Sequence, residues 1–516
     1  MRKGRFNYEL RITNYDLRIG AVSKPPITNF RQRTGKIKIF DKKIYFCFPK
    51  NGFMNFDIII IGSGPGGYVA AIRASQLGLK VGVVEKAEPG GICLNWGCIP
   101  TKSLLKSAQV YNNMVHSIEY GISVEGAIRP DFQKIIERSR NVAANMSKGI
   151  QYLFKKNKIE IIQGRGKLVD SGTVEVAATD GSVINISAPH IILATGARSK
   201  ELPGLKQDGK KVIGYREALT LPEQPKSMIV VGSGAIGSEL AFFYQTIGTK
   251  VTLVEYMPNI VPLEDEEVSK QLARSFKKAG MTVLTEATVE SVELAGELCK
   301  AKIKTKKGEE YLEADVVFSA VGVSTNIEGV GLEEVGVQTE KGKILVDSVY
   351  KTNIQGIYAI GDIVHGPALA HVASAEGIVC VEAIAGKNPK PLNYSNIPSC
   401  IYTNPEVSSV GMTEKQTREA GFELKIGKFP FTASGKASAA GEKDGFVKLI
   451  FDAKTNELLG AHLIGYNVTE MIAELVLARE TKINGHELIK IIHPHPTISE
   501  AIMESAAAAY GEVIHI

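Results

Sequence analysis

The sequence predicts an α/β protein with two doubly wound, Rossmann-like nucleotide-binding domains. Two apolar runs, residues 57–61 and 227–231, each indicate a parallel strand that is buried on both faces. Each run leads into a Gly-x-Gly-x-x-Gly turn, then a helical stretch, then a second apolar strand that ends in a glutamate. This order is typical of a dinucleotide-binding unit, and it occurs twice, about 170 residues apart.

The glycines of each turn have separate roles. In the first unit, Gly62 allows the tight turn and Gly64 lets the backbone approach a pyrophosphate, whereas Gly67 lets the helix pack closely on the strand. The N-terminus of the helix then offers N–H groups and the positive end of a dipole to the phosphates. One such motif is often only a turn, but two copies with strand, helix and glutamate in place indicate two nucleotide sites. The corresponding glycines of the second unit are Gly232, Gly234 and Gly237.

The glutamates indicate which nucleotide each unit binds. Glu85 follows Gly67 by 18 residues, where a carboxylate can accept hydrogen bonds from ribose hydroxyls. Glu255 has the same place in the second unit, and its charge would repel a 2′-phosphate. The residues after it, Tyr-Met-Pro-Asn at 256–259, supply no arginine for such a phosphate. The second unit therefore favours NAD over NADP.

A pair of cysteines directly follows the first unit, in the segment Gly-Gly-Ile-Cys-Leu-Asn-Trp-Gly-Cys-Ile-Pro-Thr-Lys. Pro100 fits the first turn of a helix running to about residue 110, which would place Cys98 at the positive end of that helix. The dipole or Lys102 would lower the pKa of a thiol there. A structural disulfide or half of a zinc site is the alternative, but Cys93 and Cys98 lack the usual zinc spacing. The pattern favours a redox-active dithiol.

A histidine motif near the C-terminus supplies a candidate base. The segment from His493 to Glu500 reads His-Pro-His-Pro-Thr-Ile-Ser-Glu. Dithiol oxidation needs a group that accepts a thiol proton, and histidine is the side chain whose ordinary pKa suits that task near pH 7. Glu500, five residues after His495, can orient the imidazole. A single histidine near a C-terminus is more often a surface residue.

Composition excludes several classes of protein. No run of eighteen or more apolar residues appears in the 516-residue chain, so we expect no membrane span. The few cysteines disfavour a secreted disulfide scaffold and favour a reducing compartment. The net charge of +6 divides into +10 for residues 1–53 and −4 for the remainder, which does not resemble a nucleic-acid-binding surface. Besides the close pair, cysteines stand at positions 47, 299, 380 and 400.

Residues 1–53 differ from the rest of the chain. They hold 13 Lys/Arg, 3 Asp/Glu and a single serine, whereas transit peptides are rich in arginine and serine and poor in acids. We expect an upstream extension of the reading frame, with a targeting peptide as the alternative. A protein beginning at Met54 should fold and turn over normally. The expected location is cytoplasmic, or the mitochondrial matrix if residues 1–53 are a transit peptide.

These motifs, in this order, resemble the class I pyridine nucleotide-disulfide (flavin disulfide) oxidoreductases, and within them the dihydrolipoamide dehydrogenase family. The likeness covers residues 55–516. It implies a redox-active Cys93–Cys98 disulfide, one tightly bound FAD per subunit, and NAD as the second cofactor. It also makes His495 the catalytic base, with Glu500 as its partner. No metal is expected.

By the same resemblance, the remaining site residues contact the two cofactors. Lys102 and Glu239 would form an ion pair near the flavin ring. Besides Gly62, Gly64, Gly67 and Glu85, FAD would contact Lys102, Gly166, Thr195, Gly196, Ala197, Asp362, Ala368, Leu369, Ala370 and His371. Besides Gly232, Gly234 and Gly237, NAD would contact Glu239, Glu255, Val289 and Gly322.

The resemblance also implies domain boundaries. A strand near 191–197 and another near 356–361 each end on a glycine turn, and from about residue 397 the pattern changes to alternating strands followed by helices near 471–480 and 501–510. The expected parts are an N-terminal extension (1–53), an FAD domain with the redox disulfide (54–199), an NAD domain (200–325), a central segment returning to FAD (326–396) and an α+β dimerisation domain (397–516).

The implied function is oxidation of protein-bound dihydrolipoyl groups by a homodimer, with NAD⁺ as final acceptor. The partner would be the lipoyl domain of a 2-oxo acid dehydrogenase acyltransferase or of the glycine cleavage system, and the sequence does not distinguish these complexes. An NADPH-linked reductase of a small disulfide is the enzymatic alternative, which coenzyme preference would separate. A non-enzymatic FAD-binding protein is the other, against which the retained Cys93, Cys98, His495 and Glu500 argue.

Two positions depart from the family pattern. Trp96 replaces the usual valine between the two cysteines. Val-Ser-Thr-Asn at 323–326 stands where the family commonly has Gly-Arg-x-Pro-Asn. Related enzymes differ elsewhere: glutathione reductases tend to carry Val-Pro-Lys-Lys where this chain has Ile-Pro-Thr-Lys at 99–102, mercuric reductases end in a cysteine pair, and soluble transhydrogenases lack the redox cysteines.

Overall fold

The first nucleotide unit lies in a five-stranded parallel sheet. The computed structural model describes residues 54–516, so the expectations for residues 1–53 lie outside it. The sheet has the order β21-β8-β2-β3-β4. Its central strand β2 is fully buried, as its four isoleucines predict. The elements are β2 (Ile58–Ile61), α1 (Pro65–Gln76), β3 (Val81–Glu85), β4 (Glu160–Gln163), β8 (His190–Leu193) and β21 (Ile357–Ala359).

The second nucleotide unit repeats this arrangement. Its five parallel strands have the order β10-β17-β11-β12-β13, with the strand before the glycine turn again in the middle. Its elements are β10 (Val212–Ile213), α5 (Tyr215–Ala218), β11 (Ser227–Val231), α6 (Ala235–Thr246), β12 (Lys250–Val254), α7 (Glu266–Lys278), β13 (Thr282–Leu284) and β17 (Val316–Ser319).

Three helices between β3 and β4 carry the cysteine segment and its support: α2 (Gly91–Trp96), α3 (Cys98–Val115) and α4 (Phe132–Lys156). The helix expected around Pro100 therefore exists and extends to Val115, five residues beyond the expected end. The sequence analysis assigned no element to the 25 residues of α4. This helix is amphipathic, buries Phe132, Ile150 and Phe154 among others, and packs on α2 and α3.

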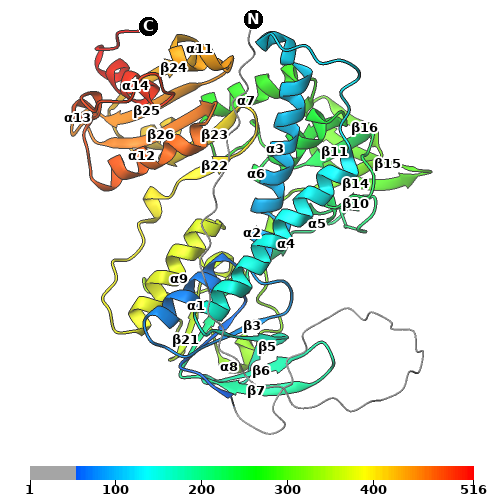
Figure 1. The fold of residues 1–516 in the computed structure, drawn as a ribbon, viewed down its shortest axis with the longest axis vertical. Helices are drawn as coiled ribbons and strands as arrows, with labels where there is room; N and C mark the ends of the chain where they lie inside the picture. The colour runs from blue at the N-terminus through cyan, green and yellow to red at the C-terminus, as the bar shows by residue number, and fades with distance from the viewer. Residues whose placement is uncertain (1–53) are drawn as a thin grey trace, which may run out of the picture. The chain divides into compact units, whose positions relative to one another are not determined.

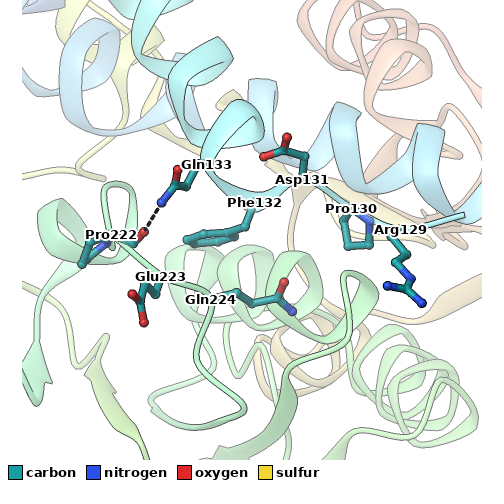
Figure 2. Close-up of a pocket in the computed structure, with 8 residues that line it drawn as sticks. All are labelled: Arg129, Pro130, Asp131, Phe132, Gln133, Pro222, Glu223 and Gln224. Atoms are coloured by element: carbon teal, nitrogen blue, oxygen red, sulfur yellow. Dashed lines mark hydrogen bonds between the residues drawn. The ribbon is translucent and has the colours of Figure 1, made fainter.

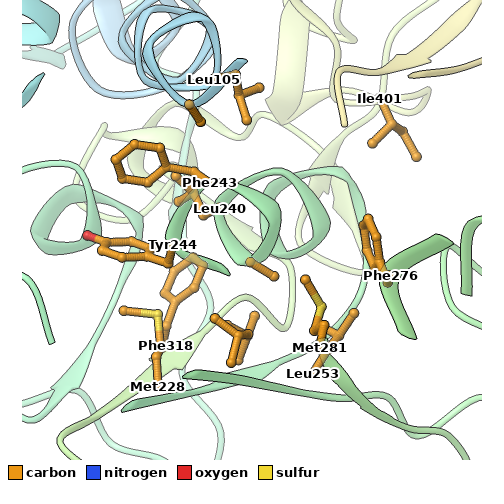
Figure 3. Close-up of a cluster of buried hydrophobic side chains, with 14 of the residues drawn as sticks. Leu105, Met228, Leu240, Phe243, Tyr244, Leu253, Phe276, Met281, Phe318 and Ile401 are labelled. Atoms are coloured by element: carbon orange, nitrogen blue, oxygen red, sulfur yellow. The ribbon is translucent and has the colours of Figure 1, made fainter. Parts of the chain in front are cut away.

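Helix α3 also packs into the core of the second unit. Figure 3 shows Leu105 of α3 beside Leu240 and Phe243 of α6 in one buried hydrophobic cluster. The same cluster contains Ile401, from the start of the C-terminal sheet. The helix that begins at Cys98 is thus fixed by burial of apolar side chains from two parts of the chain.

The segment after the second unit returns to the first. Strand β21 pairs with β8, and helix α9 (Ala370–Ile384) packs along α1, as Figure 1 shows. Glycines permit this close approach, since a Cβ on Gly377 would lie 2.8 Å from the carbonyl oxygen of Gly66. Two short strands, β9 (Ala197–Ser199) and β18 (Val323–Thr325), form an antiparallel ribbon. The unusual segment 323–326 therefore pairs with the residues that leave the first unit.

The C-terminal part is a five-stranded antiparallel sheet with the order β22-β23-β26-β25-β24. Helix α12 packs on β23 and β26, and α14 packs on β24 and β25 (Figure 1). Both helices were expected near these positions. The elements are β22 (Ser399–Ile401), β23 (Glu406–Gly411), α10 (Glu414–Glu419), β24 (Leu424–Pro430), α11 (Gly435–Ala440), β25 (Phe446–Asp452), β26 (Leu458–Gly465), α12 (Val468–Glu480), α13 (Gly485–Ile489) and α14 (Glu500–Tyr510).

Two larger, mainly antiparallel sheets and one two-stranded hairpin, β19 (Thr339–Glu340) with β20 (Lys343–Ile344), complete the sheets of the described residues, and the sequence analysis predicted none of them. One sheet is mostly antiparallel and has the order β1-β7-β6-β5; the other is an antiparallel meander in the order β14-β15-β16. Within residues 54–516, no helix is both long and apolar enough to cross a membrane. The strands are β1 (Met54–Asn55), β5 (Arg165–Leu168), β6 (Thr173–Ala177), β7 (Val183–Ser187), β14 (Thr288–Ala295), β15 (Leu298–Thr305) and β16 (Gly308–Ala314).

Candidate active site

The glycine turn of the first unit leaves no room for side chains except toward a ligand. Gly62 has a φ of +102°, and a Cβ there would lie 2.3 Å from the carbonyl oxygen of Ala194. A Cβ on Gly67 would lie 1.9 Å from the carbonyl oxygen of Gly62. By contrast, a Cβ on Gly64, at the N-terminus of α1, would meet no described atom within 4 Å. The turn is therefore closed on the protein side and open where a pyrophosphate would approach.

The carboxylate of Glu85 is held in place by the same turn. Its Oε2 accepts hydrogen bonds from the backbone N–H of Ser63 (2.9 Å) and from the Ser63 hydroxyl (2.6 Å), and Oε1 accepts one from the N–H of Ala87 (2.8 Å). A carboxylate can accept about four hydrogen bonds, so these three leave capacity for a ribose hydroxyl. The position of this glutamate thus fits the ribose of a bound nucleotide.

The second unit has the same geometry. Gly232 has a φ of +95°, a Cβ on Gly237 would lie 2.0 Å from the carbonyl oxygen of Gly232, and a Cβ on Gly234 would meet no described atom within 4 Å. Glu255 accepts hydrogen bonds from the N–H and hydroxyl of Ser233, at 2.9 and 2.6 Å. Both units therefore fit a dinucleotide by the same physical test: an open glycine and a fixed carboxylate.

Other residues expected at the flavin site lie around the first turn. A Cβ on Gly166 would lie 3.2 Å from the side chains of Ile61 and Val84 at the ends of β2 and β3. Asp362, which follows β21, is half-buried, and desolvation raises the pKa of its carboxyl although the charge of Lys343 lowers it. A half-buried carboxyl with a perturbed pKa at the end of a parallel strand is typical of a ligand site. Thr195, Gly196 and Ala197 follow β8, and Ala368, Leu369, Ala370 and His371 lie at the N-terminal end of α9.

The two remaining residues expected at the NAD site lie near the second turn. Gly322 stands two residues after Ala320, whose carbonyl oxygen would lie 2.5 Å from a Cβ on Gly232. Val289 stands two residues after Ala287, whose N–H donates to the backbone carbonyl of Glu255. The fold therefore brings both positions to the second unit.

Cys93 and Cys98 are both free thiols in this structure. The interaction between the two thiols raises the pKa of Cys93 and lowers the pKa of Cys98. Burial opposes the lowering at Cys98, whereas the positive charge of Lys102 favours it. Cys98 is also the first residue of α3, where a helix dipole stabilises a thiolate. The pair is arranged so that one proton leaves readily.

The loop that carries the cysteines is fixed by its backbone. Gly90 and Gly91 have φ of +101° and +60°, and the N–H of Gly90 donates to the carbonyl of Ser63 at 3.0 Å. The buried side chain of Asn95 donates to the carbonyls of Pro89 and Gly91, at 3.1 and 3.0 Å. The redox segment therefore docks directly on the glycine turn of the first unit.

The expected ion pair between Lys102 and Glu239 is present. Lys102 Nζ donates to both carboxylate oxygens, at 2.9 and 2.8 Å, and Glu239 is buried. The N–H of Tyr402 also donates to Glu239, at 3.0 Å, and Lys102 Nζ lies 4.3 Å from the centre of the Tyr402 ring. This pair joins α3, α6 and the C-terminal sheet beside Cys98.

The histidine motif forms two separate carboxylate pairs. His495 Nδ1 donates to Glu500 Oε1 at 2.8 Å, and the other oxygen of Glu500 accepts from the N–H of Thr497 at 2.8 Å. Burial raises the pKa of Glu500, but these two bonds outweigh it and lower that pKa. His493 instead pairs with Glu474, at 2.8 Å, and this bond raises the pKa of His493. Only His495 has its carboxylate partner on the motif itself.

Sequence reasoning missed several residues that hold the site. Ser63 and Ser233 occupy the same position in both turns, and the repeated Gly-Ser-Gly could have revealed them. Asn95 acts through local contacts within the redox segment, whereas Tyr402 acts through a tertiary contact, for which the sequence offered no signal. Arg140, in α4, donates to the carbonyl of Asn95 at 2.6 Å and belongs to a helix that was not predicted.

A surface hollow elsewhere has no part in this chemistry. It measures about 480 Å³ and lies between the start of α4 and the loop after α5 (Figure 2). Its Phe132 ring lies 6.2 Å from the ring of Tyr244, which anchors α4 on the second unit. None of the residues expected to bind a cofactor or react lines it. Among residues 54–516, no group of three or more His, Cys, Asp or Glu could hold a metal ion.

Comparison with known proteins decides the family. The pyridine nucleotide-disulphide oxidoreductase family matches residues 56–377, and the dimerisation domain of the same family matches residues 397–506. The chain belongs to this family. It is therefore an FAD- and NAD(H)-dependent oxidoreductase, and the fold class predicted from the sequence is confirmed. The dimerisation domain supports a homodimer.

Named relatives cover most of the chain. Dihydrolipoyl dehydrogenase of Rhizobium etli is 48% identical over 477 residues, which are 89% of this chain and 99% of that protein. Its namesake from Chlorobaculum tepidum is 49% identical over 452 residues, 87% of this chain and 96% of that protein. Among solved structures, LpdA of Mycobacterium tuberculosis has a TM-score of 0.82 at 27% identity, covering 88% of this chain and 99% of its own.

Proposed function

We propose that the chain is a dihydrolipoyl dehydrogenase, which oxidises protein-bound dihydrolipoyl groups and reduces NAD⁺. The observation that carries this proposal is the dithiol at the N-terminus of α3, which docks on the turn of one nucleotide unit and lies beside an ion pair that links α3 to the other unit. Curated relatives of that name, 42–49% identical to this chain, support it. The partner is a lipoyl domain of a 2-oxo acid dehydrogenase complex or of the glycine cleavage system, and the location is cytoplasmic.

The chain's own residues handle the thiols. A substrate thiolate attacks the Cys93 sulfur of the oxidised enzyme; a mixed disulfide forms, the Cys93–Cys98 bond breaks, and Cys98 leaves as a thiolate. The second substrate thiolate then attacks the substrate sulfur of the mixed disulfide, which releases the lipoyl disulfide and Cys93. The lowered pKa of Cys98 makes it the better leaving group. His495, oriented by Glu500, accepts the thiol protons.

The first nucleotide unit would hold FAD through Gly64, Glu85 and Asp362, and the second would hold NAD⁺ through Gly234 and Glu255. Bound there, FAD would supply the two-electron chemistry that links the dithiol to NAD⁺. The positive charge of Lys102, which Glu239 holds next to Cys98, lowers the pKa of the Cys98 thiol, whereas the Glu239 carboxylate itself raises that pKa. Two nucleotide units are needed because the enzyme uses two dinucleotides, FAD and NAD⁺.

The His495–Glu500 pair serves the disulfide of the other subunit in the dimer. Within one chain the His495 side chain is 78% exposed, although its partner Glu500 is held by Thr497. An oriented base that faces solvent in a single chain is available to a neighbouring subunit. The dimer is then obligatory for activity, since a single subunit would have cysteines without a base.

Mixed dimers test this arrangement. Cys93→Ser and His495→Gln homodimers should each be inactive. In a mixed dimer one site carries both lesions and the other carries neither, so re-association should restore about half of the wild-type activity per dimer. A mixture that stays inactive despite proven hetero-dimer formation would contradict a base supplied across the interface.

Rapid-mixing kinetics with dihydrolipoamide test the proposed function itself. The flavin absorbance should fall on mixing with dihydrolipoamide and recover with NAD⁺, and at least about tenfold more slowly with NADP⁺, because Glu255 repels a 2′-phosphate. Efficient turnover with NADP⁺, or no reduction by dihydrolipoamide, would contradict the proposal and favour an NADPH-linked disulfide reductase.

A further inference from the structure

Trp96 is the single tryptophan of the chain, and it stands between the two cysteines as the last residue of α2. The family usually has a small aliphatic residue here, so the reaction itself does not explain the indole. The ring is half-buried and packs against the core cluster of the second unit. Its position therefore calls for a role that a valine does not fill.

Two arginines and one glutamate hold this ring. The guanidinium carbons of Arg140 and Arg216 lie 4.1 and 5.0 Å from the ring centre, and the indole N–H donates to Glu88 Oε2 at 3.3 Å. Arg140 comes from α4 and Arg216 from α5, so the ring connects the redox loop with both nucleotide units. We call Trp96, Arg140, Arg216 and Glu88 the tryptophan clamp.

The clamp also fixes the backbone between the cysteines. The guanidinium of Arg140 that lies over the ring donates to the carbonyl of Asn95 at 2.6 Å. Burial lowers the pKa of Arg140, as does repulsion from Arg216, whereas Glu88 raises it. Two like charges are thus kept close together, which the indole face and the carboxylate offset. The arrangement is a built contact rather than a chance surface stacking.

We infer that the tryptophan clamp is a positioning device that holds the Cys93 and Cys98 sulfurs together in the reduced enzyme, ready to form their disulfide. This inference rests on the proposed redox role of the two cysteines. A disulfide forms more readily when the loop keeps both thiols close, because little chain entropy is then lost on closure. The disulfide restrains the loop by itself, so the clamp matters most in the dithiol form.

The clamp acts through position and not through charge. The pKa values of the two thiols are governed by the interaction between them, by burial and by the charge of Lys102. Loosening the clamp gives the redox loop more conformational freedom in the dithiol form than in the disulfide form. Its loss should therefore shift the equilibrium toward the dithiol and make the disulfide easier to reduce.

Redox titration of the holoenzyme tests the inference. The protein is equilibrated with reduced and oxidised dithiothreitol; as the two thiols become a disulfide, they lose two protons and two electrons, and oxidised dithiothreitol becomes the dithiol. Free thiols are trapped by alkylation and counted by mass spectrometry at Cys93 and Cys98. The midpoint is the ratio of reduced to oxidised dithiothreitol at which half of the enzyme carries the disulfide. Trp96→Val should move this ratio about fivefold in favour of the enzyme dithiol, which equals about 20 mV for two electrons. Trp96→Phe, which keeps a ring, should move it less.

Control variants separate the clamp from general destabilisation. Tyr311→Val removes a ring that lies 4.7 Å from Lys300 in the β14–β16 sheet, and it should leave the midpoint unchanged. Arg216→Lys keeps the charge but loses the planar stacking group, and it should move the midpoint about twofold in the same direction as Trp96→Val. The emission of Trp96 in the wild type should change in step with the fraction of disulfide.

The outcomes are distinct. An unchanged midpoint in Trp96→Val, with normal FAD content and melting temperature, would overturn the clamp. If Trp96→Val does not retain FAD, Arg216→Lys decides in the same way, and an unchanged midpoint there would overturn it. A wild-type enzyme that forms no Cys93–Cys98 disulfide at any buffer ratio would overturn both the clamp and the proposed function. A wild-type disulfide with an unshifted variant would overturn the clamp alone.

Discussion

The two nucleotide units are nearly identical at their turns and differ in what docks on them. In each, a serine between two glycines donates its N–H and hydroxyl to the terminal glutamate, at 2.9 and 2.6 Å in both Ser63–Glu85 and Ser233–Glu255. Such agreement between segments about 170 residues apart shows that the local sequence determines the turn.

The difference begins at the residue that donates to the serine carbonyl. In the first unit this residue is Gly90, which leads through Gly91 into the cysteine segment. In the second it is Val261, which adopts an uncommon φ of +42° and leads into α7. A Cβ on Gly91 would lie 2.6 Å from Cα of Gly64, so the redox loop sits against the turn itself. One scaffold thus binds a nucleotide twice, and the docked segment decides where thiol chemistry occurs.

The largest expected effect comes from replacing the last glycine of each Gly-x-Gly-x-x-Gly turn by alanine. Because a methyl group would lie 1.9 Å from a backbone oxygen in Gly67→Ala and 2.0 Å in Gly237→Ala, each turn must distort, at a cost of about 1–3 kcal/mol or more. Gly67→Ala should purify without FAD. Gly237→Ala should keep FAD and weaken NAD⁺ binding at least about tenfold. FAD absorbance and NAD⁺ titration measure the two effects.

Gly149→Ala is the matched control, since its Cβ would meet no described atom within 4 Å in helix α4. It should bind both cofactors normally. If Gly67→Ala retained FAD, or if Gly237→Ala released it, the separate assignment of the two units would be wrong.

A smaller effect is expected from the glutamate of the second unit. Glu255 Oε1 accepts from the N–H of Met257 at 2.9 Å, so a side chain at 257 starts beside the ribose position. Glu255→Ala with Met257→Arg should shift the ratio of NADP⁺ to NAD⁺ specificity at least about tenfold toward NADP⁺. Met257→Arg alone should shift it little, because Glu255 would pair with the arginine. Steady-state kinetics with both coenzymes decide, and an unchanged ratio with intact FAD would remove Glu255 from the ribose site.

The smallest effect concerns the pKa of Cys98. Its pKa is lowered in the folded protein, so the thiolate persists below the usual value of 9.0 and is lost as the pH falls through the lowered pKa. Lys102→Met should raise this pKa, since an adjacent positive charge is removed. Lys106→Met, on an exposed lysine of the same helix, should not. The pH dependence of alkylation measures both variants, and equal profiles would contradict a role for Lys102.

Patterns within short segments allowed the two units and the helix after Cys98 to be predicted. Continuous apolar runs and glycine spacing are local properties, so β2, α1 and β3 appear where the sequence placed them. Helix α4 was missed although its apolar residues recur at the three- and four-residue spacing of an amphipathic helix; this apolar face packs on α2 and α3. The segment 323–326, which departs from the family pattern, pairs with β9, and the side-chain amide of Asn326 donates to the backbone carbonyl of Thr195.

The residues of the candidate site also divide into those that the sequence could identify and those that it could not. Residues on motifs, such as Glu85 and Lys102, could be identified from spacing and resemblance. Residues that orient them, such as Tyr402 under Lys102 and Arg140 over Trp96, come from elements remote in sequence. Their contacts exist only after the chain has folded, so no local pattern predicts them.

The most direct test of the account is the rate at which dihydrolipoamide and NADH each reduce the bound flavin in the Cys98→Ser variant. If the first unit carries the thiol chemistry and the second delivers electrons to and from NAD, Cys98→Ser should slow flavin reduction by dihydrolipoamide at least about a thousandfold. Reduction of the same flavin by NADH should stay within about twofold of the wild type, since that route avoids the thiols. Flavin absorbance after rapid mixing measures both rates. Normal reduction of the variant by dihydrolipoamide would contradict the account.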